Sequence, residues 1–216
     1  MGARPPGLLD ARNRAVKRVI DYLLGLPAFL LSLPVIAFFA LWIKATGHGS
    51  AFYSQEREGI DGTRIRVWKL RTMYPDAEAT LRRYLDENPE ADAEWQRYCK
   101  LRNDPRVLPG LGSFLRRTSL DELPQLWNVL RGDMSLVGPR PYPDYHLDRF
   151  HPEFRALRRS VLPGITGLWQ VTTRSEGGLD VQQALDTRYI LGWSIWLDLV
   201  ILLRTIPCVL SRRGAW

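Results

Sequence analysis

The sequence predicts an α+β fold in which a compact, helix-rich domain with a short sheet is attached to a membrane by an N-terminal apolar segment. Three observations lead to this expectation. Residues 19–43 form an apolar run, residues 64–71 alternate between apolar and basic side chains, and residues 76–102 show helical periodicity. With 216 residues and 45% hydrophobic content, the chain suits one domain with one anchor better than two large domains.

The apolar run of residues 19–43 contains Asp21, Pro27, Ser32 and Pro34. At about 1.5 Å per residue it is long enough to cross a hydrocarbon core of roughly 30 Å. Two features favour instead a re-entrant helix-break-helix that enters and leaves one leaflet. Pro34 removes an amide from the helix and Ser32 can bond back to a carbonyl, so a break is tolerated. Basic residues flank both ends, whereas a spanning helix shows a one-sided excess.

We therefore expect a basic tail at residues 1–15, a re-entrant membrane helix at 16–46 and one domain at 47–216. This domain includes a C-terminal apolar segment at 193–211 that contains Asp198 and Arg204. Because charges are costly at the bilayer centre, the segment is predicted to be an amphipathic helix at the membrane interface. A buried core helix is the alternative.

The net charge of +7 and the eight tryptophans are compatible with several anionic partners. Basic residues beside apolar segments favour a membrane surface or an anionic substrate over nucleic acid, and no zinc-finger or RNA-binding signature accompanies them. Cys99 and Cys208 are far apart and form no CxxC motif, so they indicate neither a disulfide framework nor a metal site. A reducing, cytoplasmic location is compatible with these cysteines.

The alternation in residues 64–71 predicts a strand that places Lys69 and Arg71 on the same face as two apolar residues. Its basic end could reach a phosphate, although solvated charges at a strand end are common. Residues 76–102 predict two amphipathic helices split near Asn88 and Pro89. We expect them to pack against the core or the membrane surface and assign them no chemistry.

Two adjacent carboxylates, Asp121 and Glu122, follow Ser119 in an S-x-x-E pattern. This pattern is typical of a capping box, which is the alternative to a chemical role. Pro124 and Gly132 predict a helix that begins near Asp121 and ends near the glycine. At the positive end of a helix, carboxylates could hold a divalent cation beside a phosphate.

Two proline- and glycine-rich segments follow the carboxylates. Residues 138–141, Gly-Pro-Arg-Pro, restrict the backbone on both sides of Arg140 and so preorganise its guanidinium for phosphate. Residues 163–170 contain Gly164, Thr166 and Gln170, where glycine permits close approach of the backbone to a ligand. A glycine turn leading into a strand is the alternative for the second segment.

These motifs, in this order, resemble those of the bacterial sugar transferases, which are monotopic polyprenyl-phosphate phosphoglycosyl transferases. The resemblance rests on T-S-L-D-E-L-P-Q at 118–125, K-L-R-T-M at 69–73 and P-G-I-T-G at 163–167, and it extends from about Val16 onward. Leu70 replaces the family's usual Phe, and a leucine separates the Ser-Pro pair of the membrane break. The insertion at 76–102 is most similar to the galactose- and glucose-phosphate transferase branch.

The resemblance implies an enzyme that transfers sugar-1-phosphate from a UDP-sugar to undecaprenyl phosphate and releases UMP, the first membrane step in assembling a surface glycan. It implies that Asp121 is the nucleophile and that Glu122, with Asp121, holds Mg²⁺ or Mn²⁺. It also implies the cytoplasmic face of the bacterial inner membrane, contact with membrane lipids, and a homodimer as one option. The substrate-binding residues that it implies are Lys69, Arg71, Arg140, Gly164, Thr166, Gln170 and Arg174.

Two other functions remain open from the sequence. One is a membrane-tethered scaffold of a glycan assembly complex that has the same fold without turnover. The other is an enzyme that uses the same anchor to act on a different anionic lipid. Lipid-dependent UMP release distinguishes the three.

Overall fold

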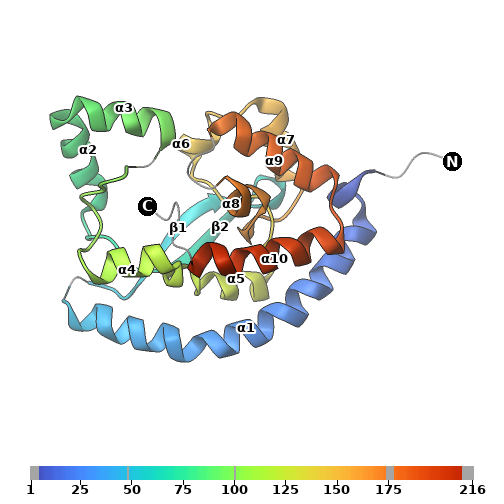
Figure 1. The fold of residues 1–216 in the computed structure, drawn as a ribbon, viewed down its shortest axis with the longest axis horizontal. Coiled ribbons are helices and arrows are strands. Elements are labelled where there is room, and N and C mark those ends of the chain that lie inside the picture. Colours follow the sequence, from blue (N-terminus) through green and yellow to red (C-terminus); the bar gives the residue numbers. More distant parts are fainter. Residues whose placement is uncertain (1–4, 48, 100, 174–177, 211–216) are drawn as a thin grey trace.

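The computed structural model describes residues 5–47, 49–99, 101–173 and 178–210. Figure 1 shows a long helix, α1, along one side of a body that consists of shorter helices around two small sheets. The predicted α+β class is confirmed. After α1, the helices are α2 (Ala77–Glu87), α3 (Pro89–Tyr98), α4 (Leu111–Thr118), α5 (Gln125–Arg131), α6 (Asp144–Leu147), α7 (Pro152–Arg159), α8 (Leu168–Thr172), α9 (Leu179–Leu191) and α10 (Ile195–Leu210).

Helix α1 (Ala11–Ala45) begins where the side chain of Asp10 accepts a hydrogen bond from the amide of Arg12, at 2.8 Å. This is an N-cap, which satisfies one of the amides left over at a helix start. The helix therefore begins five residues before the expected start at residue 16. A short 3-10 helix, η1 (Gly7–Leu9), precedes it within the segment that was expected to be a tail.

The expected break between two helices is not present, although every residue of α1 is described. Helix α1 continues through Pro27 and Pro34 and is drawn as a curved helix in Figure 1. Each proline removes one hydrogen bond and leaves the neighbouring turns intact, so curvature rather than interruption results. The backward bond from Ser32 is present, since its hydroxyl donates to the carbonyl of Phe29 at 2.7 Å.

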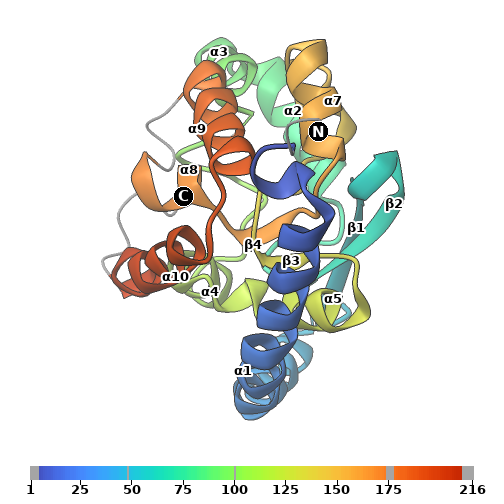
Figure 2. The same ribbon diagram turned by 90° about the vertical axis from the view of Figure 1, so that its right-hand side faces the viewer.

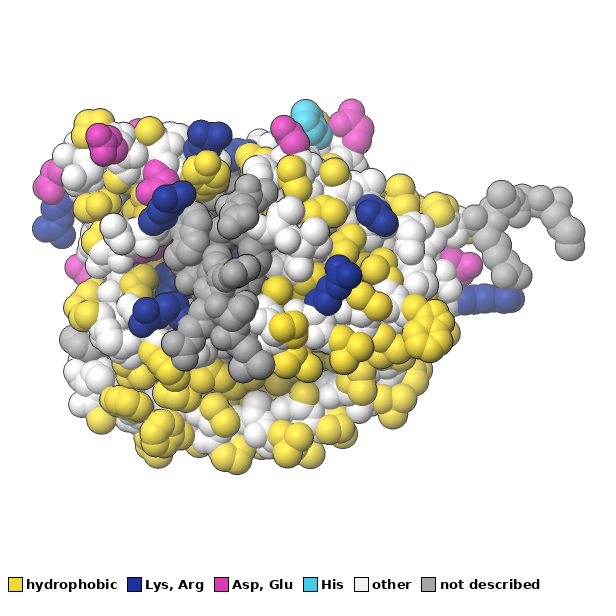
Figure 3. Space-filling view, viewed as in Figure 1, with side chains coloured by type: hydrophobic (Ala, Val, Ile, Leu, Met, Phe, Trp, Pro, Cys, Tyr) yellow, Lys and Arg dark blue, Asp and Glu magenta, His cyan; other side chains and the backbone are white. Residues whose placement is uncertain are grey.

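One side of α1 packs on the domain and the other is exposed and apolar. Lys17 and Asp21 near its start and Ile36, Phe39 and Ile43 near its end are buried. Figure 3 shows hydrophobic side chains gathered along the edge of the molecule formed by α1. The exposed apolar side chains include Leu23, Leu26, Leu30, Leu31 and Leu41. Among the described helices, only α1 is long and apolar enough to cross a membrane.

Two small sheets carry the loops that contribute residues to the candidate site. Strands β1 (Phe52–Glu58) and β2 (Arg64–Leu70) form an antiparallel hairpin, which confirms the predicted strand up to Leu70. Its turn, η2 (Ile60–Gly62), places Asp61 and Gly62 at positive φ. Strands β3 (Ser135–Val137) and β4 (Gly164–Thr166) are parallel, and they bring the Gly-Pro-Arg-Pro segment beside the segment that begins at Gly164.

The predicted pair of amphipathic helices is confirmed as α2 and α3, which meet at Asn88. Pro89 occupies the first turn of α3, the position at which a helix tolerates proline. Figures 1 and 2 both show this pair on the opposite side of the body from α1. They are therefore remote from the apolar side of α1, so of the two expectations for this pair, packing against the core or against the membrane surface, the second is not supported.

The main core lies between β2, β3, α5, α9 and α10. Its side chains come from distant parts of the sequence, and Ile201 of α10 is fully buried in it. A second core joins Ile36, Phe39 and Ile43 of α1 to Leu70 and Leu115. The end of α1 is thus attached to the domain by buried apolar contacts, and its start by the buried Lys17 and Asp21, which bind Asp198 and Ser135.

Helix α10 has features of both predictions for its sequence, an amphipathic helix at the membrane interface and a buried core helix. Its exposed side presents Trp196, which is 77% exposed, with Leu203 and Ile206. Its other side is buried, and there Asp198 accepts bonds from Lys17 of α1 at 2.6 Å and from the hydroxyl of Tyr189 at 2.7 Å. Asp198 therefore faces the core, where its charge is paired, so it does not oppose contact of the exposed side with lipid.

Candidate functional site

The two carboxylates lie in a short 3-10 helix, η3 (Leu120–Glu122), between α4 and α5. Ser119, which ends α4, has a φ of 55°, and its side chain makes no capping bond with the described residues. The capping box is therefore not formed. Instead the amide of Glu122 donates to the carbonyl of Ser119 at 3.2 Å. Helix α5 begins at Gln125, after Pro124, and not near Asp121 as predicted; it ends at Arg131 with Gly132 as its C-cap at a φ of 96°, as predicted.

Glu122 is held by two cations from different parts of the fold. Lys69 of β2 donates to its Oε1 at 2.6 Å, and Arg140 donates to the same oxygen at 2.5 Å and to Oε2 at 3.3 Å. Burial by itself raises the pKa of a carboxyl group, but Arg140 and Lys69 hold the pKa of Glu122 well below its usual range. Glu122 is therefore ionised at neutral pH.

The neighbouring carboxylate differs sharply in its environment. Asp121 is 6% exposed, and its described ion-pair partner is Lys69, whose Nζ lies 3.8 Å from Oδ2. Burial raises the pKa of Asp121 to about 6, and the charge of Glu122 adds to this rise while Lys69 opposes it. Two adjacent carboxylates thus have separated pKa values, which is typical of sites where one group acts and the other supports it.

Arg140 is positioned by contacts on both its side chain and its backbone. Its guanidinium binds Glu122, and that charge raises the pKa of Arg140. Its carbonyl accepts a hydrogen bond from the buried Arg158 at 2.6 Å. The guanidinium of Arg158 in turn lies 5.3 Å from the ring centre of Tyr142. These contacts, with the flanking prolines, make Arg140 a preorganised cation.

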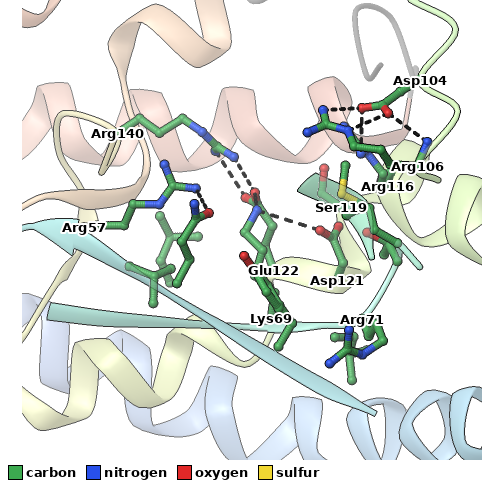
Figure 4. Close-up of a pocket in the computed structure, with 18 of the residues that line it drawn as sticks. Arg57, Lys69, Arg71, Asp104, Arg106, Arg116, Ser119, Asp121, Glu122 and Arg140 are labelled. Carbon is green, nitrogen blue, oxygen red and sulfur yellow. Dashed lines mark hydrogen bonds and ion pairs between the residues drawn. The ribbon is translucent and has the colours of Figure 1, made fainter. Parts of the chain in front are cut away.

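A cavity of about 1240 Å³ opens beside the carboxylates. Figure 4 shows Glu122 and Asp121 with Arg57 and Arg140 on one side and the Asp104, Arg106 and Arg116 cluster on the other. Basic residues outnumber acidic residues in the lining of the cavity, and they are Arg57, Lys69, Arg71, Arg82, Arg106, Arg116, Arg140 and Arg149. Such a lining attracts anionic groups, phosphates in particular.

The other residues that were predicted to bind substrate differ in how freely their side chains face the cavity. Arg71 lines the cavity, but its Nε donates to the carbonyl of Ser50 at 2.6 Å, so part of its guanidinium is engaged with the backbone. Thr166 and Gln170 also line the cavity. The hydroxyl of Thr166 bonds that of Thr205 at 2.8 Å. Gln170 donates to the carbonyl of Ile165, while its Oε1 has no hydrogen-bond partner among the described residues.

The role expected for Gly164 is not supported. A Cβ at this position would lie 2.0 Å from the amide nitrogen of Gly138, so the missing side chain permits β4 to approach the segment after β3. Gly164 therefore permits close packing of the two segments, and because it begins β4, the motif leads into a strand as the alternative proposed. Arg174 lies outside the described residues.

Several cavity residues were not identified from the sequence. Arg116 is close enough to Asp121 to lower its pKa, and Arg57 interacts with Arg140 and Glu122. Arg116 precedes Asp121 by five residues, and this short separation in the sequence could have identified it as a site residue. Arg57 lies in β1, where nothing in the local pattern distinguishes it from an ordinary strand residue.

The two carboxylates provide the hard oxygen donors that Mg²⁺ and Mn²⁺ prefer. Within the described residues there is no group of three or more His, Cys, Asp or Glu side chains arranged for a metal ion. Mg²⁺ commonly takes only one or two carboxylates and completes its coordination with water and substrate phosphate oxygens. The residues therefore fit such a shared ion, with Asp121 less engaged than Glu122, whose oxygens already bind Lys69 and Arg140.

Comparison with known proteins finds relatives over nearly the whole chain. The family model described as "Bacterial sugar transferase" matches residues 12–212. The chain is 40% identical over 210 residues to "Undecaprenyl-phosphate galactose phosphotransferase" of Salmonella typhimurium, covering 97% of this chain and 43% of that protein. It is 38% identical over 205 residues to "UDP-glucose:undecaprenyl-phosphate glucose-1-phosphate transferase" of Escherichia coli, covering 92% of this chain and 41% of that protein.

A third relative is similar in length to this chain. "Exopolysaccharide production protein ExoY" of Rhizobium meliloti is 40% identical over 200 residues, which cover 93% of this chain and 88% of that protein. The chain spans less than half the length of the two phosphotransferases. The extent of the family match and the identity over nearly the whole chain show that this protein belongs to the bacterial sugar transferase family.

Proposed function

We propose that this protein transfers sugar-1-phosphate from a UDP-sugar to undecaprenyl phosphate, giving undecaprenyl-diphosphate-sugar and UMP. The observation that carries the proposal is the pair Asp121 and Glu122, buried beside Lys69 and Arg140 in a basic cavity. The names of the Salmonella and Escherichia relatives support the choice of substrates. The name of the Rhizobium relative supports a role in exopolysaccharide assembly.

The reaction proceeds in two displacements. In the first, a carboxylate oxygen of Asp121 bonds to the phosphorus that carries the sugar, and the bond from this phosphorus to the bridging oxygen breaks to release UMP. In the second, an oxygen of undecaprenyl phosphate bonds to the same phosphorus and the bond to Asp121 breaks. The second step regenerates the carboxylate, so turnover is ping-pong.

The cations around the carboxylates stabilise charge on the phosphate oxygens during both steps. Arg140 and Lys69 are already in place on Glu122, both line the cavity, and the Nζ of Lys69 lies 3.8 Å from Asp121. Glu122, with Asp121, would hold Mg²⁺ or Mn²⁺. The chemistry that the bound ion supplies is a reduced repulsion between an anionic nucleophile and an anionic diphosphate.

The exposed apolar surfaces of the fold support a position of this cavity beside a membrane. Helix α10 contributes Leu202 and Thr205 to the cavity lining and exposes Trp196 and Leu203 on its surface. Together with the exposed side of α1, this surface would rest in the cytoplasmic leaflet of the bacterial inner membrane. The lipid phosphate would then reach the cavity from the headgroup layer.

The covalent step gives the decisive test of the function. Brief exposure of the detergent-solubilised protein to a UDP-sugar without lipid should add the mass of a sugar-phosphate to a peptide that contains Asp121. Adding undecaprenyl phosphate should then remove this mass and produce the lipid-linked sugar. Kinetics that require both substrates to be bound together would contradict the two-step reaction. UMP release unaffected by undecaprenyl phosphate but dependent on another anionic lipid would favour that alternative, and no release would favour a scaffold.

The rate of the first step is expected to depend on pH through Asp121. Because the pKa of this buried nucleophile is raised to about 6, the rate should fall about tenfold per unit below that pH and level off above it. Adduct formation at single turnover is the appropriate measurement, since the phosphate monoester of the lipid itself titrates near pH 6. A rate that is constant between pH 5 and 8 would show that the ionisation of Asp121 does not control the step.

The membrane topology can be tested because both ends of α1 are attached to one domain. Lys17 binds Asp198 near the start of the helix, and Ile43 is buried near its end, so both ends should lie on the cytoplasmic side. In a variant that lacks Cys99 and Cys208, an impermeant thiol reagent applied to intact cells should label neither Arg12→Cys nor Ser50→Cys. Opening the inner membrane should expose both. Labelling of one site in intact cells would indicate a spanning helix.

A further inference from the structure

The cavity extends well beyond the carboxylates and includes a pair of aromatic rings, Trp95 of α3 and Tyr145 of α6. Their ring centres are 6.0 Å apart and their planes are inclined by 36°. Tyr145 is 50% exposed, although it lines the cavity. We call these two residues the aromatic pair. The reaction described above uses neither of them.

One series of contacts connects the nucleophile to Trp95. Arg116 interacts with Asp121, and its guanidinium lies 3.9 Å from Asp104. Asp104 also binds Arg106 at 2.6 Å, and the guanidinium of Arg106 lies 5.1 Å from the ring centre of Trp95. Two arginines held by one carboxylate thus lie along the cavity between Asp121 and Trp95, as Figure 4 shows for Asp104, Arg106 and Arg116.

A second series of residues, linked by one ion pair and by charge interactions, leads from Glu122 toward Tyr145. Arg140 binds Glu122, and the charge of Arg57 acts on both Arg140 and Tyr145. Gln55 holds Arg57 through a hydrogen bond of 2.5 Å to its guanidinium. Arg57 and Arg140 therefore line the other side of the cavity. The two series meet at the aromatic pair, so arginines connect the carboxylates to the rings along both sides.

We propose that the aromatic pair binds the base of the nucleoside diphosphate sugar, with the diphosphate between the two rows of arginines. This inference rests on the proposed function and extends it by assigning the nucleoside subsite. The sugar-bearing phosphorus must lie at Asp121, so the leaving nucleoside monophosphate has to point along the cavity away from the nucleophile. A flat base needs a flat face to stack on, and a ring or a guanidinium supplies one.

Binding of UMP to the purified protein tests the subsite without requiring turnover. Tyr145→Ala and Trp95→Ala should each weaken the Kd for UMP at least about fivefold, the lower end of what removing a base-stacking ring costs. Tyr145→Phe and Trp95→Phe keep a ring and should stay near the original Kd. Ribose 5-phosphate, which carries the same phosphate and no base, should bind equally to the original protein and to Tyr145→Ala. Calorimetry in detergent gives these values.

A matched control is available on the same helix. Tyr98 of α3 is also a partly buried aromatic residue, but it does not line the cavity. Tyr98→Ala should therefore leave the Kd for UMP unchanged. If Trp95→Ala fails to fold, Tyr145→Ala decides the question, since this half-exposed ring can be removed with little loss of packing.

Two results would overturn the subsite. The first is a Kd for UMP that is unchanged in Tyr145→Ala and in folded Trp95→Ala. The second is a KM for the UDP-sugar that rises in these variants while the Kd for UMP does not, which would place the sugar rather than the base on the rings. Failure of the proposed function gives a different result. In that case the original protein shows no lipid-dependent UMP release, regardless of how the variants bind UMP.

Discussion

Asp121→Asn is expected to reduce lipid-dependent UMP release by at least about a thousandfold, to the background of the assay. The amide preserves the shape of the side chain but cannot form the phosphosugar bond. The sugar-phosphate adduct should disappear as well, as measured by mass spectrometry after brief exposure to a UDP-sugar. Substantial release by folded Asp121→Asn would exclude Asp121 as the nucleophile.

The same substitution is expected to stabilise the protein, which separates lost chemistry from lost structure. Burial raises the pKa of Asp121 to about 6, so keeping it ionised at pH 7.5 costs on the order of 3 kcal/mol of folding free energy. Because the folded-state pKa lies above the unfolded value, this cost develops as the pH rises from about 4 through 6. Asp121→Asn should therefore melt at a higher temperature at pH 7.5, and the difference should shrink toward pH 4.

Glu122→Gln provides the matched comparison with the opposite sign. The pKa of Glu122 is held low by Arg140 and Lys69, so its charge contributes to the folded state at neutral pH. Removing that charge leaves both cations with a weaker partner in a buried site. We expect Glu122→Gln to lose activity and to melt at a lower temperature at pH 7.5. A higher melting temperature for Glu122→Gln than for Asp121→Asn would contradict this assignment of the two carboxylates.

Lys17→Met is expected to destabilise the folded protein by about 3–5 kcal/mol, because it leaves a buried charge without its partner. Lys17 is 6% exposed and Asp198 is 2% exposed, and their charged atoms are 2.6 Å apart. Lys17 also lies 3.8 Å from the buried Asp21. The loss should appear as a lower melting temperature in detergent and as faster proteolysis between α1 and the domain.

A second substitution should recover part of this loss. Asp198→Asn removes the uncompensated charge and keeps an oxygen that can accept the hydrogen bond from Tyr189. We expect Lys17→Met/Asp198→Asn to melt above Lys17→Met, so the two effects should not add. Lys44→Met is the control, since this exposed lysine lies at the other end of α1 and has no described ion pair. Equal melting temperatures for Lys17→Met and Lys44→Met would show that the buried pair contributes nothing.

Local chemistry accounts for what the sequence predicted correctly. The strand at 64–70 follows from alternation, the split at Asn88 follows from Pro89, and the end of α5 at Gly132 follows from the positive φ that glycine tolerates. The order of the motifs was also sufficient to identify the family, which the match over residues 12–212 confirms. Each of these features depends on residues that are neighbours in the chain.

The errors arose where a local pattern had more than one solution. Pro34 permits a break, but α1 continues through it because the neighbouring turns and the packing of both its ends on the domain remain intact. The S-x-x-E pattern permits a capping box, but the backbone of Ser119 adopts positive φ. Gly164 permits approach of a ligand, but the backbone at Gly138 occupies that space. For Pro34 and Gly164 a contact with a distant part of the chain decided between outcomes that the sequence left open.

The sequence by itself determined the family, the main elements and the identity of the two carboxylates. Only the tertiary structure decided that Arg140 pairs with Glu122, that Lys69 lies closer to Glu122 than to Asp121, and that Arg57, Arg106 and Arg116 line the same cavity. The physical reason is that a carboxyl pKa depends on burial and on charges within a few ångströms. Those charges come from β2, from the segment after β3 and from α4, and folding alone brings them together.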